Sequence, residues 1–509
     1  MKRFGWWLAP VLVAWVPVAR QLAGNADQVA LTAALPVFGL LLAAALLLAA
    51  VLRGIAGDGA KGGLALCVGW VLFFSHGWAF ERLWDGRSLE SVPRINFGLM
   101  GGELLLVALA VVVLRRLQRD LEPVLRWVTL TAGFLLVASL GSYVWRGSPV
   151  QPEVAHPPSA IHPTEPSSAL RPDVYHLVLD GYARSDVLRD VYGFDNREFL
   201  DALAARGFRI LPETYSNYST TFLSLSATLN HRYHEPVNGS LPGGRRHYYR
   251  LIQEADVLTA FRSLGYKVHW VGTTWSGTED SPLADEVHRL APLPFHNEFA
   301  AVFWRRTPLR QFEPTVAHSH LFAFETLEAL SGRPEPTYTF AHVLAPHNPY
   351  VFDADGTIIA NVPQVLQFNR RIFQAEQRWS NQDAYIAQLR YINRRVLEML
   401  DVLLARPGPR PVVILQSDHG SAFRVGRTPN DVEVAQERHG VLNAVLAPPQ
   451  WQAAFPERGT LINTYPILLH HGFGRAVDPL ESRVFYSWYG SPYQPKDLTA
   501  AFGFAPSDG

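Results

Sequence analysis

Long apolar runs fill the first 146 residues, whereas short apolar runs alternate with polar stretches in the remainder. Most of the long runs approach the roughly 20 residues that a helix needs to cross a hydrocarbon core of about 30 Å. They cover residues 4–19, 29–51, 63–80, 95–114 and 124–145. The first is the shortest, but no Ala-x-Ala cleavage motif follows it in a suitable place, so we interpret it as a retained span. The pattern predicts a transmembrane domain of five helices over residues 1–146.

Basic residues beside these runs predict the orientation in the membrane. Eight lie on the side of the amino terminus and five on the other: Lys2, Arg3, Arg53, Lys61, Arg115, Arg116, Arg119 and Arg126 against Arg20, Arg82, Arg87, Arg94 and Arg146. Because the more basic side of a membrane protein stays in the cytoplasm, we expect the amino terminus in the cytoplasm and the spans in the cytoplasmic (inner) membrane of a bacterium. An odd number of spans then places the rest of the chain outside, in a periplasm or the exterior.

Only the fourth predicted span carries an acidic or basic residue near its middle, Glu103. Ionisable residues at such depth mark transport or proton pathways, and they also occur as paired contacts between helices. His76 of the third span is the candidate partner for such a contact. The sequence leaves the role of Glu103 open, and the spans are interpreted mainly as an anchor.

After the spans, prolines recur through residues 147–171, which predicts an extended linker. From residue 172 to residue 509, strand-like runs alternate with helical patterns, which is typical of an α/β domain with a central, mostly parallel sheet. The strand-like runs are residues 174–179, 208–211, 267–272, 337–344, 412–417 and 441–447. The helical patterns are residues 196–206, 222–230, 257–264, 382–405 and 461–471.

Charge and cysteine content narrow the class of function. The chain has 45 basic and 45 acidic residues, a balance that argues against a nucleic-acid-binding surface. Its single cysteine, Cys67, lies in an apolar run. One chain can therefore form neither a disulfide framework nor a thiolate-rich zinc site.

Polar residues follow two of the strand-like runs at the point where each run ends. Asp180 follows residues 174–179, and Asp418 and His419 follow residues 412–417. Chemistry in open α/β sheets gathers beyond the carboxyl ends of the strands, and carboxylates and imidazoles bind divalent metal ions there. Each residue also has an ordinary explanation, because an aspartate can cap the next helix and a histidine can lie at the surface.

A hydroxyl cluster, Ser219-Thr220-Thr221, precedes the helical pattern at 222–230. One of these hydroxyls could be an N-cap, or a nucleophile at a helix terminus whose free N–H groups stabilise an arriving phosphate or sulfate. His347 lies in a loop between two prolines and suits either a surface turn or the active site. A threonine of the cluster with Asp180, Asp418 and His419 would hold one divalent ion, which would activate the weakly nucleophilic hydroxyl.

The order of these motifs resembles the sulfatase and alkaline phosphatase superfamily, particularly the membrane-anchored branch with lipoteichoic acid synthases and lipid A phosphoethanolamine transferases. The resemblance implies one zinc or manganese ion, with Mg²⁺ as a further candidate, and a threonine that takes up the transferred group. In that branch the nucleophile is commonly followed three positions later by serine. Thr221 with Ser224 fits this spacing, whereas Thr220 would have Leu223 there. Thr221 is therefore the expected nucleophile and fourth metal ligand.

The same resemblance implies roles for other residues. His347 is expected to bind substrate or protonate the leaving group, His439 to bind substrate or metal, and Ser224 and Trp275 to line the substrate pocket. The chain also departs from its relatives, since Asp180 stands where the transferases usually have glutamate and no cysteine lies outside the membrane part. The segment after Thr221 lacks the proline and arginine of the sulfatase motif, which argues against sulfate-ester hydrolysis by the usual route.

The sequence thus predicts a membrane-anchored, metal-dependent transferase. It would move a phosphoglycerol or phosphoethanolamine type of group from a phospholipid donor to an envelope lipid or glycan acceptor, with no nucleic-acid partner. With water as the acceptor, the same residues would make a phosphodiesterase, a phosphatase or another sulfatase-like hydrolase. A third alternative is an envelope protein that keeps the fold and binds a glycan or a partner without catalysis.

Overall fold

The computed structural model describes most of the chain, and its described part falls into two compact units. The described residues are 5–84, 91–147, 171–236, 239–241, 243–290, 297–312, 316–359, 379, 381–428 and 430–505. The first unit comprises Met1–Val150 and Ala291–Pro314, and the second comprises Gln151–Leu290 and Thr315–Gly509. The predicted linker, apart from its end residues, lies outside the described residues.

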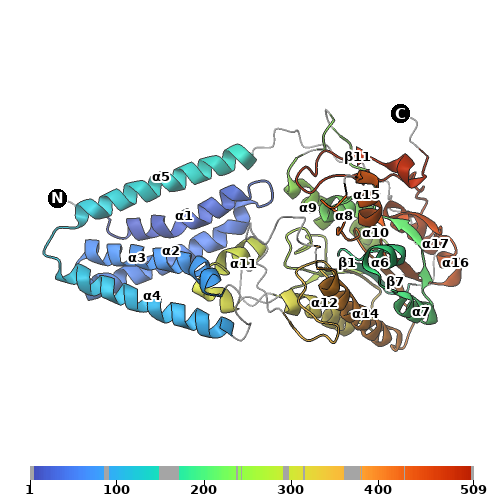
Figure 1. The fold of residues 1–509 in the computed structure, drawn as a ribbon, viewed down its shortest axis with the longest axis horizontal. Helices are drawn as coiled ribbons and strands as arrows, with labels where there is room; N and C mark the ends of the chain where they lie inside the picture. Colours follow the sequence, from blue (N-terminus) through green and yellow to red (C-terminus); the bar gives the residue numbers. More distant parts are fainter. Residues whose placement is uncertain are drawn as a thin grey trace. The chain divides into compact units, whose positions relative to one another are not determined.

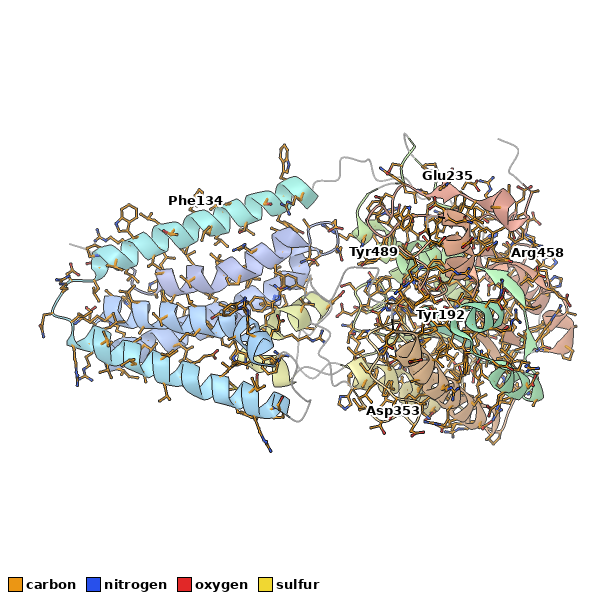
Figure 2. The ribbon with its side chains drawn as sticks, in the orientation of Figure 1. Phe134, Tyr192, Glu235, Asp353, Arg458 and Tyr489 are labelled. Carbon is orange, nitrogen blue, oxygen red and sulfur yellow. The ribbon has the colours of Figure 1, made fainter. Side chains whose placement is uncertain are left out.

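The first unit contains the five expected apolar helices (Figure 1): α1 (Leu8–Gly24), α2 (Leu31–Ala56), α3 (Gly59–Trp84), α4 (Ser91–Arg116) and α5 (Glu122–Gly147). Among the described residues, α2 to α5 are long and apolar enough to cross a membrane, and α1 is a shorter apolar helix. Large apolar side chains remain exposed on them, such as Phe134 on α5 (Figure 2). A contiguous apolar surface of this kind suits a lipid environment. The predicted helical membrane part is confirmed.

Glu103 on α4 contacts α3, as the sequence allowed. Its Oε1 lies 3.0 Å from Nδ1 of His76, whose Nε2 lies 2.8 Å from Oδ1 of Asn96. His76 and Asn96 are both buried. His76 of α3 thus forms hydrogen bonds with Glu103 and Asn96 of α4, and Glu103 acts as a contact between the two helices.

A segment from the second half of the chain returns to the first unit. It consists of α11 (Glu298–Trp304) and the short helix η1 (Pro308–Phe312). Gln21 Nε2 donates to the carbonyl of Phe299 at 3.0 Å, and the N–H of Gly77 donates to the carbonyl of Arg306 at 2.9 Å. A Cβ on Gly77 would lie 2.8 Å from Cα of Arg306, so this close approach requires glycine. The apolar run of α11 has only 7 residues, too few to be recognised as a span.

The second unit is built on a sheet with strand order β2-β8-β7-β1-β6-β4-β5 in its described part. Its strands are β1 (Val174–Leu179), β2 (Arg209–Ile210), β4 (Lys267–Val271), β5 (Glu286–His288), β6 (Thr337–Val343), β7 (Val412–Gln416) and β8 (Asn443–Leu446). The five strands from β7 to β5 are parallel, whereas β8 and β2 each run antiparallel to their neighbours. The predicted, mostly parallel sheet is confirmed.

Helices cover both faces of this sheet. Along β1, Tyr175 and Leu177 enter one apolar core and Val174 and Val178 enter the other, as alternation along a strand requires. The first core includes α6 (Ser185–Tyr192), α7 (Arg197–Ala205), α12 (Val316–Leu330) and α14 (Gln382–Leu404). The second includes α8 (Thr221–Asn230), α9 (Arg245–Gln253), α10 (Asp256–Ser263), α16 (Pro449–Gln452) and α17 (Thr464–Phe473).

Smaller elements complete the unit. They are β3 (Glu213–Tyr215) paired with β9 (Arg458–Thr460), β10 (Phe485–Tyr486) paired with β11 (Lys496–Asp497), α15 (Asp431–His439), η3 (Leu461–Asn463) and η4 (Thr499–Phe502). The long predicted helix at 382–405 is α14, whose N-cap Asn381 accepts from the N–H of Ala384. Several elements were not predicted from the sequence, among them the 15-residue helix α12, the shorter helices α6, α9 and α15, and the strand β5.

His176 at the centre of β1 gives a prediction about acid stability. The ring is buried and bonds to the hydroxyl of Tyr465, and burial lowers the pKa of His176 to about 3. The unfolded histidine takes up a proton near pH 6.5, so stability present above that pH is lost as the pH falls toward 3. Between pH 6.5 and 4 the loss amounts to about 3 kcal/mol, at 1.36 kcal/mol per pKa unit. We expect His176→Phe to reduce the dependence of the unfolding free energy on pH, measured by urea denaturation at pH 7 and pH 4.5.

The matched control is His470→Phe, which removes an exposed histidine of the same unit. This control should denature with the pH dependence of the wild type. An equal acid sensitivity in the wild type and in His176→Phe would show that His176 does not contribute to it.

Candidate metal centre and nucleophile

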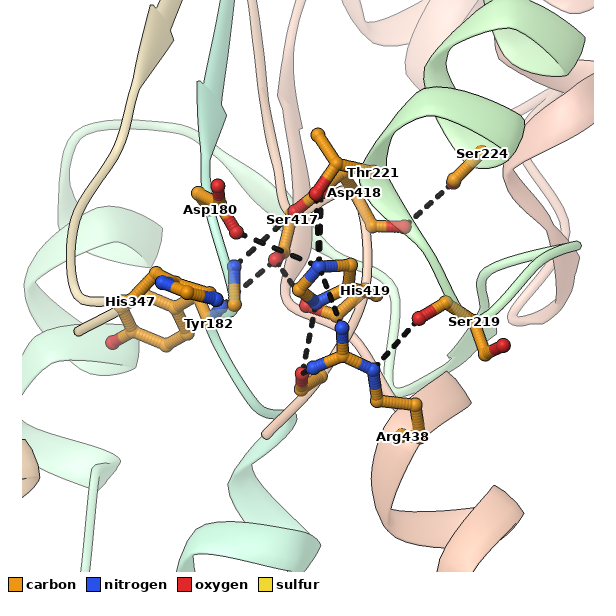
Figure 3. A network of polar contacts seen from close by, with 12 residues as sticks. Asp180, Tyr182, Ser219, Thr221, Ser224, His347, Ser417, Asp418, His419 and Arg438 are labelled. Carbon is orange, nitrogen blue, oxygen red and sulfur yellow. Dashed lines mark hydrogen bonds and ion pairs between the residues drawn. The ribbon is translucent and has the colours of Figure 1, made fainter. Parts of the chain in front are cut away.

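Two carboxylates meet at one edge of the sheet because β1 and β7 are parallel neighbours. Val178 pairs with Gln416, so Asp180 and Asp418 follow at equivalent positions beyond the strand ends (Figure 3). The N–H of Gly181 donates to Oδ1 of Asp418 at 3.2 Å. Gly181 has a φ of +72°, a left-handed conformation that glycine adopts without strain. The turn after β1 therefore holds the two buried carboxyl groups together.

His419 presents a ring nitrogen to both carboxyl groups. Its Nδ1–H donates to the carbonyl of Gly420 at 3.0 Å, so Nε2 carries the lone pair. Nε2 lies 3.3 Å from Oδ2 of Asp418 and 3.6 Å from Oδ1 of Asp180. The structure thus brings together the three side chains that the sequence proposed as metal ligands.

His342 is a further member of this cluster that the sequence analysis missed. It lies inside β6, where its Nε2 is 3.6 Å from Oδ2 of Asp180 and its Nδ1 is 3.0 Å from Oγ1 of Thr278. Ligand atoms of Asp180, His342 and Asp418 all lie within 4.8 Å of one another. The sequence instead pointed to His347 in the loop after this strand, because a histidine within an apolar run resembles an ordinary core residue.

The unpaired atoms of this cluster fit a divalent cation. Oδ1 of Asp180, Oδ2 of Asp418 and Nε2 of His342 are buried without a hydrogen-bond partner in the part of the chain that the structure describes. Burying unpaired polar atoms, and carboxylates above all, is costly. A cation among them would remove that cost, and a set of nitrogen and oxygen donors suits zinc or manganese.

The electrostatics of the cluster agree with this assignment. Burial, with the neighbouring charge of Asp418, raises the pKa of Asp180 well above its usual range. Burial also raises the pKa of Asp418 to about 6, although hydrogen bonds from Thr221 and Gly181 oppose the shift. Burial lowers the pKa of His342 to about 3 and that of His419 well below 6.5. Neutral imidazoles are the form that binds metal.

Of the hydroxyl cluster, Thr221 faces these groups. It is the first residue of α8, and its Oγ1 lies 3.1 Å from Nε2 of His419. Ser219 instead donates to the carbonyl of Ser487 at 2.9 Å, and Oγ1 of Thr220 is buried without a partner among the described residues. The free N–H groups at the start of α8 favour an anion beside Thr221.

Arg438 is a second residue that the sequence analysis missed. Its Nε donates to the carbonyl of Ser219 at 2.7 Å, Nη1 to the carbonyl of Gly420 at 2.9 Å, and Nη2 to Nε2 of His419 at 2.9 Å. These contacts use three of the five donors of a guanidinium. Burial lowers the pKa of Arg438, and the charges of Asp418 and Asp180 oppose that shift. A guanidinium remains charged under such conditions and can bind a phosphoryl oxygen.

The adjacent His439 has other partners than Arg438. Its Nδ1–H donates to the carbonyl of Ser216 at 2.8 Å, and its ring packs 5.7 Å from that of Phe502. Neighbouring residues of a helix point in different directions, so Arg438 at the end of α15 faces the cluster and His439 packs into the core. These contacts support a structural role for His439, and its expected role as a substrate or metal ligand stays a prediction.

His347 and Trp275 lie around the cluster. The ring centroid of His347 is 6.1 Å from that of His419. The backbone N–H of His347 donates to the backbone carbonyl of Asp180 at 2.9 Å. The Trp275 ring stands edge-on to His342 with centroids 5.8 Å apart. Both positions are compatible with the predicted roles in substrate binding, which stay predictions.

Ser224 supports the cluster from behind. It is fully buried, and its Oγ donates to the carbonyl of Asp418 at 2.6 Å. We therefore correct its expected role from lining the substrate pocket to positioning Asp418. Ser224→Ala should lower the unfolding free energy by about 1–3 kcal/mol, because it leaves a buried carbonyl unpaired, and should weaken metal retention during dialysis.

Ser226→Ala is the matched control, because Ser226 is also buried but bonds to the carbonyl of Phe222 in its own helix. It should lower stability without changing metal retention. Equal metal retention in the two variants would argue that Ser224 does not position Asp418.

No family model and no curated protein matches the chain. Solved structures similar to it include the C-terminal periplasmic domain of EcEptC from Escherichia coli in complex with zinc, at 16% identity and a TM-score of 0.44, covering 67% of this chain and 96% of that chain. The integral membrane lipooligosaccharide phosphoethanolamine transferase A (EptA) from Neisseria meningitidis follows at 15% identity and a TM-score of 0.41, covering 73% and 70%. A sulfatase described as putative, from Bacteroides thetaiotaomicron, has 17% identity and a TM-score of 0.41, covering 64% and 79%.

These neighbours are phosphoethanolamine transferases and sulfatases. They come from the superfamily that the motif order resembles. At such identities and scores the likeness concerns the fold alone, and the function of this chain is inferred from its own site.

Proposed function

We propose that this chain is a membrane-anchored, metal-dependent transferase. It moves a phosphoryl-alcohol group, of the phosphoglycerol or phosphoethanolamine type, from a phospholipid to an envelope lipid or glycan. The supporting observation is the position of Thr221, whose Oγ1 lies at a helix amino terminus 3.1 Å from Nε2 of His419. A nucleophile in this position can attack a phosphorus atom held by the helix N–H groups.

The proposed metal ligands are Asp180, His342, Asp418 and His419, with Thr221 as the group to be activated. When bound, a zinc or manganese ion, or Mg²⁺, lowers the pKa of a hydroxyl and offsets negative charge on phosphoryl oxygens. A metal ion on Nε2 of His419 would take the lone pair that Nη2 of Arg438 now uses as its acceptor. Nη2 of Arg438 would then donate to a phosphoryl oxygen, which would favour anionic substrates.

The transfer takes two displacements. Thr221 reacts as its alkoxide, with its hydroxyl proton passed to solvent. Its Oγ1 forms a bond to phosphorus, the bond from phosphorus to the diacylglycerol oxygen breaks, and that oxygen takes the proton on Nε2 of the His347 imidazolium. In the second displacement, Nε2 of the now neutral His347 removes the proton from the acceptor hydroxyl, and the acceptor oxygen bonds to phosphorus. The bond from phosphorus to Oγ1 breaks, which returns the Thr221 alkoxide and the His347 imidazolium. The Nδ1–H of His347 donates to the carbonyl of Asn348, which fixes the ring tautomer so that Nε2 exchanges the proton.

The membrane part supports a lipid substrate by proximity. We propose that the chain lies in a bacterial cytoplasmic membrane with its amino terminus in the cytoplasm and its second unit outside. The support is the excess of basic residues on the side of the amino terminus, eight against five. The buried, unpaired carboxylates argue against a binding protein without catalysis, because a stability cost of this kind is retained where a site uses it.

The test uses the full-length chain in mixed micelles with zinc or manganese and either phosphatidylethanolamine or phosphatidylglycerol. Release of diacylglycerol with the headgroup found on a second lipid or glycan supports the transferase. Diacylglycerol with free phosphoalcohol would identify the hydrolase instead. Metal-loaded protein that releases no diacylglycerol from either donor would contradict both, and would leave the binding protein.

A further inference from the structure

A second group of potential metal ligands lies on the edge of the sheet, on β4 and β5. Its members are His269, Glu286 and His288. His269 pairs with Glu286 in the register of the two parallel strands, and residues two apart on a strand share a face. The three side chains therefore point to the same side of the sheet, and the proposed transfer uses none of them.

Their ligand atoms have the spacing of a tetrahedral site. Nδ1 of His269 lies 3.1 Å from Nε2 of His288 and 3.6 Å from Oε2 of Glu286. Nε2 of His288 lies 3.8 Å from Oε2 of Glu286. Ligands about 2.0–2.1 Å from a zinc ion in tetrahedral geometry are about 3.3 Å from one another. The observed separations lie around this value without any change in the strands.

The two oxygens of Glu286 face different partners. Oε1 lies 3.3 Å from Nη1 of Arg333, whereas Oε2 faces the two imidazoles. This division holds the carboxylate in place and leaves one oxygen for a cation. The side chains of Glu286 and His288 are 37% and 21% exposed, while His269 is fully buried. The group is thus closed by the sheet on one side and open to water on the other.

A hydrogen bond between the two rings would be the simplest alternative. It would pair one nitrogen of each ring but would leave the carboxylate oxygen 3.6 Å and 3.8 Å from them, too far for hydrogen bonds. Burial lowers the pKa values of both His269 and His288, which favours the neutral form of both rings. Neutral rings are able to bind metal.

We infer that Nδ1 of His269, Oε2 of Glu286 and Nε2 of His288 form a second divalent-metal site, which takes zinc with a water molecule as its fourth ligand. This site is independent of the centre at Asp180 and Asp418. Its effect is structural, because β5 is a three-residue edge strand that pairs only with β4 among the described strands. A metal ion with ligands from both β4 and β5 stabilises the pairing of β5 with the sheet.

The test counts zinc ions on the full-length chain. The protein is stripped with a chelator, loaded with zinc alone, dialysed, and measured by elemental mass spectrometry. We expect about two ions per wild-type chain and about one in His288→Ala and in Glu286→Gln. Asp418→Asn should also keep about one, so that Asp418→Asn with His288→Ala keeps none. The single ion retained by His288→Ala shows that this variant is folded.

Glu335→Gln is the control, because Glu335 lies beside the group but pairs with Lys267, and it should keep both ions. Cobalt(II) loaded into Asp418→Asn should give the visible absorption of a tetrahedral site, and His288→Ala should remove it. A zinc count that is the same in the wild type, His288→Ala and Glu286→Gln would overturn the second site, as would loss of the remaining ion from Asp418→Asn. Two ions retained by Asp418→Asn would count against the first centre only, so failure of one site is distinguishable from failure of the other.

Discussion

Thr221→Ala should lower turnover of a phospholipid donor by about 10³-fold or more while the protein stays folded and keeps its metal. The expected size follows from the removal of a nucleophile, which eliminates the covalent route altogether. Oγ1 of Thr221 is the hydroxyl of the cluster that lies beside Nε2 of His419. Intact-mass measurement after incubation with total membrane lipid should show an adduct on the wild type and none on the variant, and its mass gives the transferred group.

Thr220→Ala is the matched control for this result. It removes the same hydroxyl from the preceding residue, which makes no side-chain cap hydrogen bond to α8. We expect this variant to form the adduct and to turn over donor at a rate close to that of the wild type. An adduct on Thr221→Ala, or normal turnover by it, would exclude Thr221 as the nucleophile.

Asp418→Asn should abolish tight metal binding at the first centre and reduce activity to background, yet stabilise the metal-free protein at neutral pH. Burial raises the pKa of Asp418 to about 6, compared with about 3.9 for an unfolded aspartate. A group with a raised pKa contributes stability below its unfolded pKa and loses it as the pH rises through its folded pKa. The metal-free wild type should thus lose on the order of 2 kcal/mol between pH 4 and pH 8 through this group.

The measurement is thermal unfolding in chelator at pH 5 and pH 8, together with zinc content. The stability advantage of Asp418→Asn over the wild type should be larger at pH 8 than at pH 5, and zinc should stabilise only the wild type at this centre. Asp190→Asn, at an exposed carboxylate paired with Arg189, should behave as the wild type. Normal zinc content in Asp418→Asn would remove Asp418 from the ligand set.

The sheet and its metal-binding edge could be predicted because they depend on local pattern. The central strands are continuous apolar runs, and parallel neighbours bring the residues after β1 and β7 to one edge. That rule predicts that Asp180, Asp418 and His419 lie close together at this edge. Thr221 was chosen among the three hydroxyl residues because Ser224 follows it by three positions, as in the family that the sequence resembles. In the structure, Oγ1 of Thr221 contacts Nε2 of His419.

The roles of the residues that were not predicted depend on their neighbours in the folded structure, which the pattern of apolar and polar residues does not reveal. His342 has the surroundings of a core histidine until the neighbouring Asp180 is known. The choice between Arg438 and His439 depends on the rotation of α15 about its axis, because both residues end the same helix. The pairing of β4 with β5 joins His269 to a strand of three residues, and such a short run gives no clear periodic signal.

The return of α11 and η1 to the helical unit has a consequence for dividing the protein. A fragment that begins after α5 would carry this segment without the helices that cover it. Phe299 and Phe303, now buried among α1, α2 and α3 residues, would face water, and the carbonyl of Arg306 would lose the N–H of Gly77. Such a fragment should associate with detergent or with itself through α11, whereas deletion of residues 297–312 would leave the sheet intact and uncover the bundle instead.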